Sequence, residues 1–167
     1  MNFPLLPKII VPGLTSLTPT FLQERGIRLL MLDFDNTIVP YTTNTPTEAM
    51  ANWLQEMKTS SVKLCVVSNS RNDRVKQFCE QWGIACITHA QKPFSKGIDQ
   101  CVAKFGLPRQ ACALAGDQIF TDTLGGNCAG VATILVKAID NHTFWLKLRH
   151  IAEIPFIYLA RKRRILQ

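Results

Sequence analysis

The 167-residue chain lacks the long apolar runs and leader patterns that direct proteins into membranes. No segment approaches the roughly 20 apolar residues that a spanning helix needs, and the longest late run is Ile154 to Ala160. The chain begins without a charged region before an unbroken apolar stretch, and Pro4 and Pro7 interrupt its apolar character. We therefore expect neither a transmembrane protein nor a secretory signal peptide.

Disulfide and zinc patterns are also missing. The six cysteines show no C-x-x-C spacing, and several lie within apolar runs, as Cys65 does. Such cysteines are typical of small core residues in a reducing compartment. The three histidines, His89, His142 and His150, have no ligand-like spacing, which argues against a zinc site.

Acidic residues are scarce at the end of the chain. The net charge is +7, and residues 141–167 contribute six basic residues against one acid. A basic tail suits nucleic acid or an anionic membrane surface, although a solvated, solubilising end is the simpler alternative. Because aromatic and basic residues are hardly interleaved outside the tail, we do not expect a nucleic-acid partner.

The length and the hydrophobic content of 47% favour a single compact domain over residues 1–167. Its core would span about residues 25–140, and a basic amphipathic tail about 141–167. Apolar runs and helical patterns alternate, predicting strands at 29–32, 62–67, 84–87, 111–115 and 131–136 and helices at 46–58, 73–82, 95–105 and 122–128. This alternation predicts an α/β fold with a parallel sheet covered by helices on both faces.

Two acids, Asp33 and Asp35, directly follow the first predicted strand. If the extended backbone continues, they point to the same side. Two carboxylates so near to each other repel, so we expect a cation or a shared proton between them. A bare Asp-x-Asp is otherwise a common turn or helix-cap pattern, and the rest of the chain must decide between these readings.

Three further polar clusters stand at apparent strand ends: Ser68-Asn69, Lys92-Pro93, and Gly116-Asp117 with Asp122. Each alone would be read as turn or surface residues. In a parallel sheet these ends share one edge, so the clusters can converge on the Asp pair. Several carboxylates, an ammonium and a hydroxyl suit phosphoryl transfer, in which Mg²⁺ neutralises both the phosphate ester and an attacking carboxylate.

The four clusters resemble the four motifs of the haloacid dehalogenase (HAD) superfamily. The segment Asp33 to Thr37, the Lys92-Pro93 pair and the segment Gly116 to Asp122 are similar to subfamily IIIA and, within it, to the YqeG-like branch. The resemblance covers about residues 5–149. It implies a three-layer, Rossmann-type fold and a phosphohydrolase.

The resemblance also implies a role for each residue. Asp33 would be the nucleophile that forms an aspartyl-phosphate, and Asp35 the general acid and base. Mg²⁺ would be held by the carboxylates of Asp33 and Asp117 and by the backbone carbonyl of Asp35. The remaining expected site residues bind the phosphoryl group (Ser68, Asn69 and Lys92) or support the site (Thr37 and Asp122).

The motif spacing leaves no room for the cap domain that many HAD enzymes insert. Only 35 residues separate Asp33 from Ser68, and 24 separate Ser68 from Lys92. An uncapped site encloses small metabolites poorly, which favours a large or surface-presented phosphate ester. The YqeG-like branch is similar to mitochondrial phosphatidylglycerophosphate phosphatases, so the expected reaction gives phosphatidylglycerol. The alternatives are a soluble nucleotide, sugar or macromolecular phosphate as substrate, or a non-catalytic RNA- or ribosome-binding module.

The tail supports a lipid surface as partner. One helical face would carry the apolar residues Phe144, Trp145, Leu148 and Ile151. A cationic cluster from Arg161 to Arg164 follows this face in the sequence. This pattern suits the interface of an anionic phospholipid membrane, so we expect a cytoplasmic protein, peripheral on the inner face of the membrane. A terminal helix packed on the domain is the alternative, and Pro155 should interrupt the helix either way. Apolar residues near the N-terminus, among them Ile9 to Val11, either cover the sheet edge or face the membrane.

Overall fold

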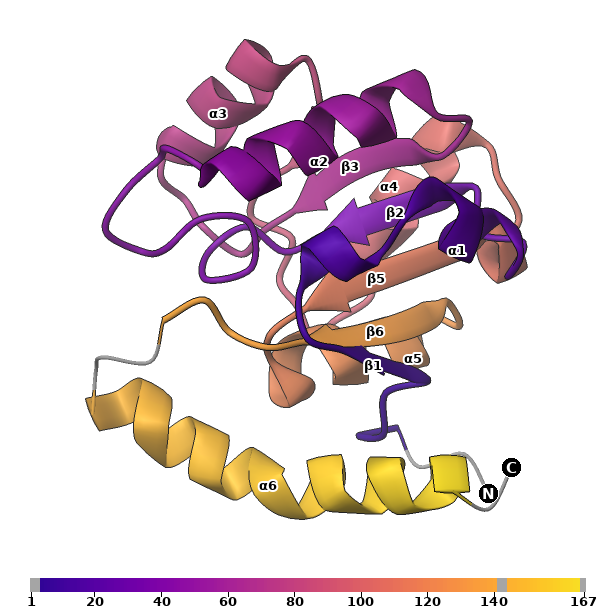
Figure 1. Ribbon diagram of the computed structural model, residues 1–167, viewed down its shortest axis with the longest axis vertical. Helices are drawn as coiled ribbons and strands as arrows, with labels where there is room; N and C mark the ends of the chain where they lie inside the picture. The colour runs from indigo at the N-terminus through magenta and orange to yellow at the C-terminus, as the bar shows by residue number, and fades with distance from the viewer. Residues whose placement is uncertain (1–3, 141–143, 166–167) are drawn as a thin grey trace.

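A parallel six-stranded sheet forms the centre of the computed structural model, which describes residues 4–140 and 144–165 (Figure 1). Its strands are β1 (Ile9–Val11), β2 (Leu29–Leu32), β3 (Lys63–Val67), β4 (Ala85–Ile87), β5 (Cys112–Gly116) and β6 (Ala132–Val136). They lie in the order β1-β6-β5-β2-β3-β4, and every pair is parallel. The predicted α/β class with a parallel sheet is confirmed.

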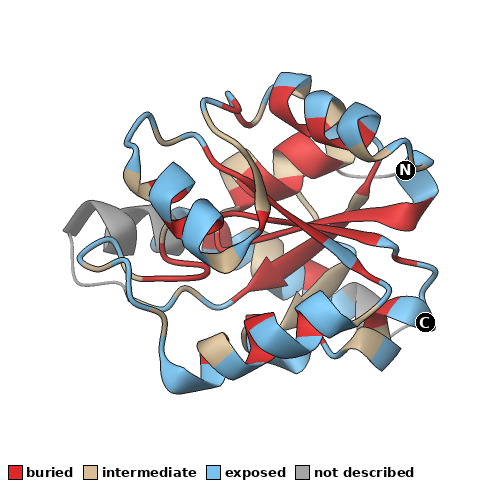
Figure 2. Cartoon of the chain, turned by 90° about the horizontal axis from the view of Figure 1, so that it is seen from above, coloured by how far each residue is buried: buried red, intermediate tan, exposed pale blue. Residues whose placement is uncertain are grey.

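The alternation of side chains along β2 explains the three layers. Leu30 and Leu32 belong to the core shared with α1 (Pro19–Gln23), α2 (Glu48–Thr59) and α3 (Arg74–Trp82). Leu29 and Met31 point to the other face and join the core that α4 (Lys96–Phe105) covers. All four residues are fully buried, as expected of a central strand with helices on both sides. Figure 2 shows the buried sheet between helices whose outer sides are exposed.

The helix boundaries follow local capping chemistry. Thr47 begins α2, and its hydroxyl accepts a hydrogen bond from the N–H of Met50 at 3.3 Å. Gly83 and Gly106 end α3 and α4 in the left-handed conformation, each with φ of 61°, which glycine adopts without a Cβ clash. These stops agree with the sequence pattern.

The ends of the chain differ from the sequence pattern in two respects. The N-terminal segment lies at the sheet edge, one of the two expected alternatives, but it does so as the strand β1, in register with β6 (Ile9 opposite Ile134), and three residues are too few for the pattern to predict a strand. The helix α6 (Phe144–Ile165) runs through Pro155 instead of being interrupted there. Proline removes one backbone donor, but Pro155 and Ile151, one turn earlier, are both exposed, so water can hydrate the freed carbonyl.

The helix α6 lies beyond the β1 edge of the sheet (Figure 1). Its described side chains are those of residues 151–162, so the predicted apolar residues Phe144, Trp145 and Leu148 lie outside the described set. The Glu153 carboxylate accepts a hydrogen bond from the N–H of Ile119 at 2.9 Å. The Phe156 ring meets the Phe120 ring edge-on at 5.9 Å. None of the helices in the described part of the chain has both the length and the apolarity to cross a membrane.

Candidate active site

The polar residues that follow the strands leave the sheet at one edge. Leu32, the last residue of β2, is in register with Val66 of β3 and Ala115 of β5. The backbone N–H of Asp33 donates to the carbonyl of Ala115 at 2.9 Å, which continues the ladder by one residue. The loops after β2, β3 and β5 therefore begin at the same level, as the sequence pattern predicts. In the described residues, no second domain is inserted between these loops.

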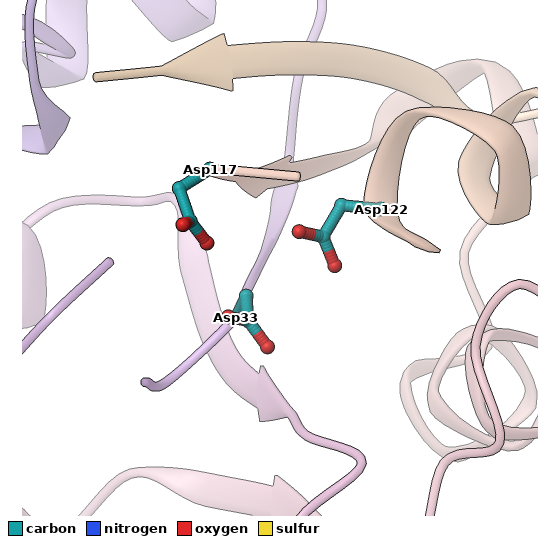
Figure 3. Close-up of side chains that lie close together, drawn as sticks. All are labelled: Asp33, Asp117 and Asp122. Carbon is teal, nitrogen blue, oxygen red and sulfur yellow. The ribbon is translucent and has the colours of Figure 1, made fainter. Parts of the chain in front are cut away.

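Three buried carboxylates meet at this edge. One carboxylate oxygen from each of Asp33, Asp117 and Asp122 lies within 4.8 Å of the other two. Figure 3 shows the three side chains close together. The Lys92 ammonium joins two of them, at 2.7 Å from Asp33 Oδ1 and 2.6 Å from Asp122 Oδ1. The Thr37 hydroxyl donates to Asp117 Oδ1 at 3.3 Å. Five expected site residues, Asp33, Thr37, Lys92, Asp117 and Asp122, thus lie together in one buried cluster.

Burial and charge shift the pKa values of this network. Burial raises the pKa of the Asp33 carboxyl to about 6, and the Lys92 ammonium opposes this only in part. Burial alone would lower the pKa of Lys92, but the Asp122 and Asp33 carboxylates outweigh it and raise the pKa above its usual value. Lys92 is therefore charged at neutral pH, whereas ionised Asp33 is held in an unfavourable environment.

The donor set of this network fits a hard divalent cation. Among the described side chains, the cluster holds three buried carboxylates, and the one ammonium that forms ion pairs there, that of Lys92, contacts two of them, which leaves an excess of negative charge. Carboxylate oxygens are the ligands that Mg²⁺ prefers in proteins. A cation there would also favour the ionised form of Asp33.

A small cavity of about 130 Å³ lies beside the carboxylates. Asp33, Asp35, Ser68, Asn69 and Lys92 line it, so the structure brings together the expected nucleophile, acid and phosphate-binding residues. Its other lining residues, which the sequence did not single out, are Tyr41, Ser70, Gln118 and Thr121.

The phosphate-binding residues differ in how they reach this cavity. The Ser68 hydroxyl is buried and accepts a hydrogen bond from the N–H of Ser70 at 3.1 Å. Because it is accepting there, its own proton is available for another acceptor. Asn69 uses its amide differently: it donates to the Lys92 carbonyl at 2.8 Å and accepts from the Lys92 N–H at 2.7 Å. These two bonds fix the backbone that presents the ammonium.

Asp35 stands apart from the other carboxylates. Its Oδ1 lies 2.9 Å from a guanidinium nitrogen of Arg74, and its side chain is 19% exposed. Burial raises the pKa of Asp35, and Arg74 opposes that shift. Arg74 also donates to the carbonyls of Pro40, Tyr41 and Thr43 and to the side chain of Asn44. One guanidinium thus joins the expected general acid to the 40–44 loop.

Sequence reasoning missed Arg74, although a signal was present. Arg74 is the first residue of α3, where the positive end of the helix dipole disfavours a cation. A basic residue there calls for an anionic partner, which the structure supplies as Asp35. Glu153 carried a second signal, because it is the one acid in the basic tail.

Gly116 gives the fourth motif its close packing. A Cβ atom at residue 116 would lie 2.2 Å from Asp122 Oδ2, so the carboxylate occupies space that any other residue would fill. The same oxygen accepts a hydrogen bond from the N–H of Gln118 at 3.1 Å. Asp122 lies on the π-helical turn η3 (Ile119–Thr123), which precedes α5 (Leu124–Cys128) where a helix from residue 122 was predicted. This turn carries the carboxylate back over the end of β5.

The chain has clear similarity to known phosphatases. The family model described as mitochondrial PGP phosphatase matches residues 3–139. The chain is 39% identical over 134 residues to a protein named probable phosphatase YqeG from Bacillus subtilis, a match that covers 80% of this chain and 78% of that protein. The expected HAD, YqeG-like resemblance is confirmed.

Solved structures share the fold at low sequence identity. An uncharacterized protein from Listeria monocytogenes matches with a TM-score of 0.53 and 14% identity, over 79% of this chain and 99% of that one. The cobalt-bound deoxy-D-mannose-octulosonate 8-phosphate phosphatase of Haemophilus influenzae matches with a TM-score of 0.54 and 11% identity, over 67% of this chain and 69% of that one. The strand order, the site and the sequence relatives agree, and the chain therefore belongs to the mitochondrial PGP phosphatase family, a family of HAD phosphatases.

Proposed function

We propose that the protein is a Mg²⁺-dependent phosphomonoester hydrolase whose reaction passes through an aspartyl-phosphate on Asp33. The observation that carries this proposal is the placement of Asp33 and Asp35 on one cavity with separate cationic partners, Lys92 and Arg74. Two acids in such different environments can take different roles, attack for one and proton transfer for the other.

In the first step, an Asp33 carboxylate oxygen bonds to phosphorus, and the bond from phosphorus to the ester oxygen breaks. Lys92 and the Ser68 hydroxyl bind the phosphoryl oxygens as negative charge redistributes. Protonated Asp35 gives its proton to the leaving alcohol. In the second step, Asp35 accepts a proton from water as the water oxygen bonds to phosphorus, and the bond from phosphorus to the Asp33 oxygen breaks. Inorganic phosphate leaves, the Asp33 carboxylate is restored and Asp35 is again protonated.

The metal would be held by the carboxylates of Asp33 and Asp117 and by the backbone carbonyl of Asp35, with Asp122 holding Lys92 at 2.6 Å. When bound, Mg²⁺ supplies positive charge that reduces the repulsion between the Asp33 carboxylate and the anionic phosphate.

The substrate that we propose is phosphatidylglycerophosphate, which would be converted to phosphatidylglycerol. The description of the matching family model supports this choice, as does the lack of a cap domain in the described chain. An uncapped site suits a phosphate group that stands at a surface, because the surface can help to exclude water.

We further propose that α6 docks the protein on an anionic membrane. Its exposed apolar residues are Ile151, Ile154, Tyr158 and Leu159. The basic residues Arg161 to Arg164 follow them in the sequence. Exposed apolar anchors next to a cationic cluster match the interface of a bilayer with anionic head groups.

A phosphate-release screen tests the substrate. Phosphatidylglycerophosphate in mixed micelles is compared with soluble monoesters, including p-nitrophenyl phosphate and deoxy-D-mannose-octulosonate 8-phosphate, with Mg²⁺ or with EDTA. We expect release from the lipid that EDTA and Asp33→Asn abolish, whereas Asp73→Asn, which changes an exposed acid on the surface, is the matched control. Rapid turnover of a soluble ester with no release from the lipid would contradict the lipid assignment and support a soluble substrate.

A further inference from the structure

A second, larger pocket lies between α6 and the β1–β6 edge of the sheet. Its volume is about 500 Å³, within the range of small-molecule sites. Its walls come from β1, the end of β6 and the inward side of α6, and most of them are apolar (Ile10, Val11, Leu135, Val136 and Ile157). None of the roles assigned so far uses this pocket.

The pocket adjoins the catalytic cluster. Asp117 lines the pocket and also belongs to the group of three carboxylates at the end of β5. The wall formed by α6 is attached to the same region, because Glu153 accepts a hydrogen bond from Ile119 and Phe156 packs on Phe120. A substrate whose phosphate lies at Asp33 could therefore extend past Asp117 into this pocket.

The acids and the cations that line the pocket differ in their partners. Its two acids already serve other groups: Glu153 accepts from the Ile119 N–H, and Asp117 accepts from Thr37. Its two cations, Lys137 and Arg161, are exposed, and within the described residues no hydrogen bond or ion pair engages either of them. The cations are thus available to an anionic ligand, and the apolar wall to a hydrocarbon chain.

We propose that this pocket binds the part of an anionic lipid that follows its phosphomonoester. A phosphodiester would lie against Lys137 and Arg161, and the beginning of an acyl chain against Leu135 and Ile157. This inference rests on the lipid substrate proposed above and adds where the remainder of that lipid is recognised. A ligand with two phosphates and a hydrocarbon chain matches both the cations and the apolar walls.

The test uses a short-chain, dihexanoyl phosphatidylglycerophosphate kept below its critical micelle concentration, so that no membrane surface contributes. For each variant, kcat/KM for this lipid is divided by kcat/KM for p-nitrophenyl phosphate, which cancels any general loss of active enzyme. Ile157→Trp fills the pocket, and Arg161→Gln removes one cation. We expect each variant to lower the ratio about tenfold, chiefly through a higher KM for the lipid. Such a change corresponds to the loss of one charge-assisted contact in Arg161→Gln and of the apolar contact with the acyl chain in Ile157→Trp.

Matched controls distinguish the pocket from nonspecific effects. Ala152→Trp adds the same ring to an exposed position of α6, and Lys104→Gln removes an exposed cation at the end of α4. Both should leave the ratio within about twofold of the wild-type value. If the wild-type protein hydrolyses the lipid and the two pocket variants keep its ratio, the pocket assignment is overturned while the lipid phosphatase stands. If the wild-type protein hydrolyses p-nitrophenyl phosphate but neither the short-chain nor the micellar lipid, the lipid substrate and the pocket assignment fail together.

Discussion

In the proposed reaction Asp33 must be ionised to attack phosphorus, yet its burial favours the protonated form. A carboxyl whose pKa is raised on folding binds more protons in the folded than in the unfolded state, between its usual pKa of 3.8 and its folded value of about 6. The free energy of unfolding therefore falls as the pH rises through this window. The metal-free protein keeps this destabilisation at neutral pH.

Asp33→Asn is expected to stabilise the metal-free protein. The amide resembles the neutral carboxyl, so in EDTA at neutral pH the variant should unfold at a higher urea concentration, with a gain of at most about 3 kcal/mol. The gain should shrink as the pH falls through this window and vanish well below pH 3.8, where Asp33 is protonated in both states of the wild-type protein. Mg²⁺ should stabilise the wild-type protein more than the variant. Equal urea midpoints of both proteins at every pH would contradict this account of Asp33.

Replacing Arg74 should lower kcat by different factors for substrates with different leaving groups. The p-nitrophenolate ion leaves without protonation, whereas an alkoxide needs a proton from Asp35, which Arg74 contacts at 2.9 Å. Without Arg74 the Asp35 carboxyl would be protonated more readily but would lose the contact that holds it beside the cavity. Because proton transfer depends on that position, we expect Arg74→Ala to lower kcat for an alkyl phosphate on the order of tenfold more than kcat for p-nitrophenyl phosphate. The control is Arg71→Ala, an exposed arginine nearby. Equal losses for both substrates would mean that Arg74 only supports the 40–44 loop.

At the scale of elements, α6 contacts the turn η3 through the buried hydrogen bond of Glu153 and the ring contact of Phe156. Glu153→Ala would leave the Ile119 N–H without an acceptor, at a cost of about 1–3 kcal/mol in the free energy of unfolding. Because η3 carries Asp122, we also expect weaker stabilisation by Mg²⁺ in thermal melts. Glu153→Gln retains a carbonyl acceptor and should recover most of both effects. A Glu153→Ala variant with wild-type stability and Mg²⁺ response would refute the coupling.

The strands that hold the site could be predicted because each is a short apolar run with a polar residue at its end. Leu29 to Leu32 is fully buried, so its sequence is continuously apolar, and Asp33 marks where the strand opens to the site. The parallel arrangement then places Ser68, Lys92 and Asp117 at the same edge without further information.

Contacts between distant segments could not be predicted in the same way. The guanidinium of Arg74 reaches Asp35 and the 40–44 loop through turns whose conformation leaves no periodic pattern in the sequence. The residues of β1, Ile9 to Val11, are β-branched and favour a strand, but three residues are too few to predict one, and their pairing depends on the open edge that β6 offers. The course of α6 through Pro155 likewise depends on what packs beside the helix.

For the whole molecule, the position of positive charge should govern membrane binding. Replacing Lys162, Arg163 and Arg164 by glutamine should weaken binding to anionic vesicles on the order of 100-fold, at about 1 kcal/mol for each basic residue near the surface. The matched control replaces three exposed lysines elsewhere, Lys58, Lys76 and Lys104, and so carries the same net charge. Vesicle sedimentation at low salt measures both. Equal loss in the two variants would show that net charge, rather than the end of α6, directs binding.

The pairing of β1 with β6 has a consequence for the order in which the protein is made. The hydrogen bonds of Lys8 with Thr133 join residues 125 positions apart. When synthesis has reached the end of η3, every proposed catalytic residue is part of the nascent chain, but β6, the partner strand of β1, has not yet been made. Until β6 has emerged, the apolar segment Ile9–Val11 is an unpaired strand on the nascent chain. The wall that β1 shares with α6 therefore depends on segments made after those that carry the proposed site residues.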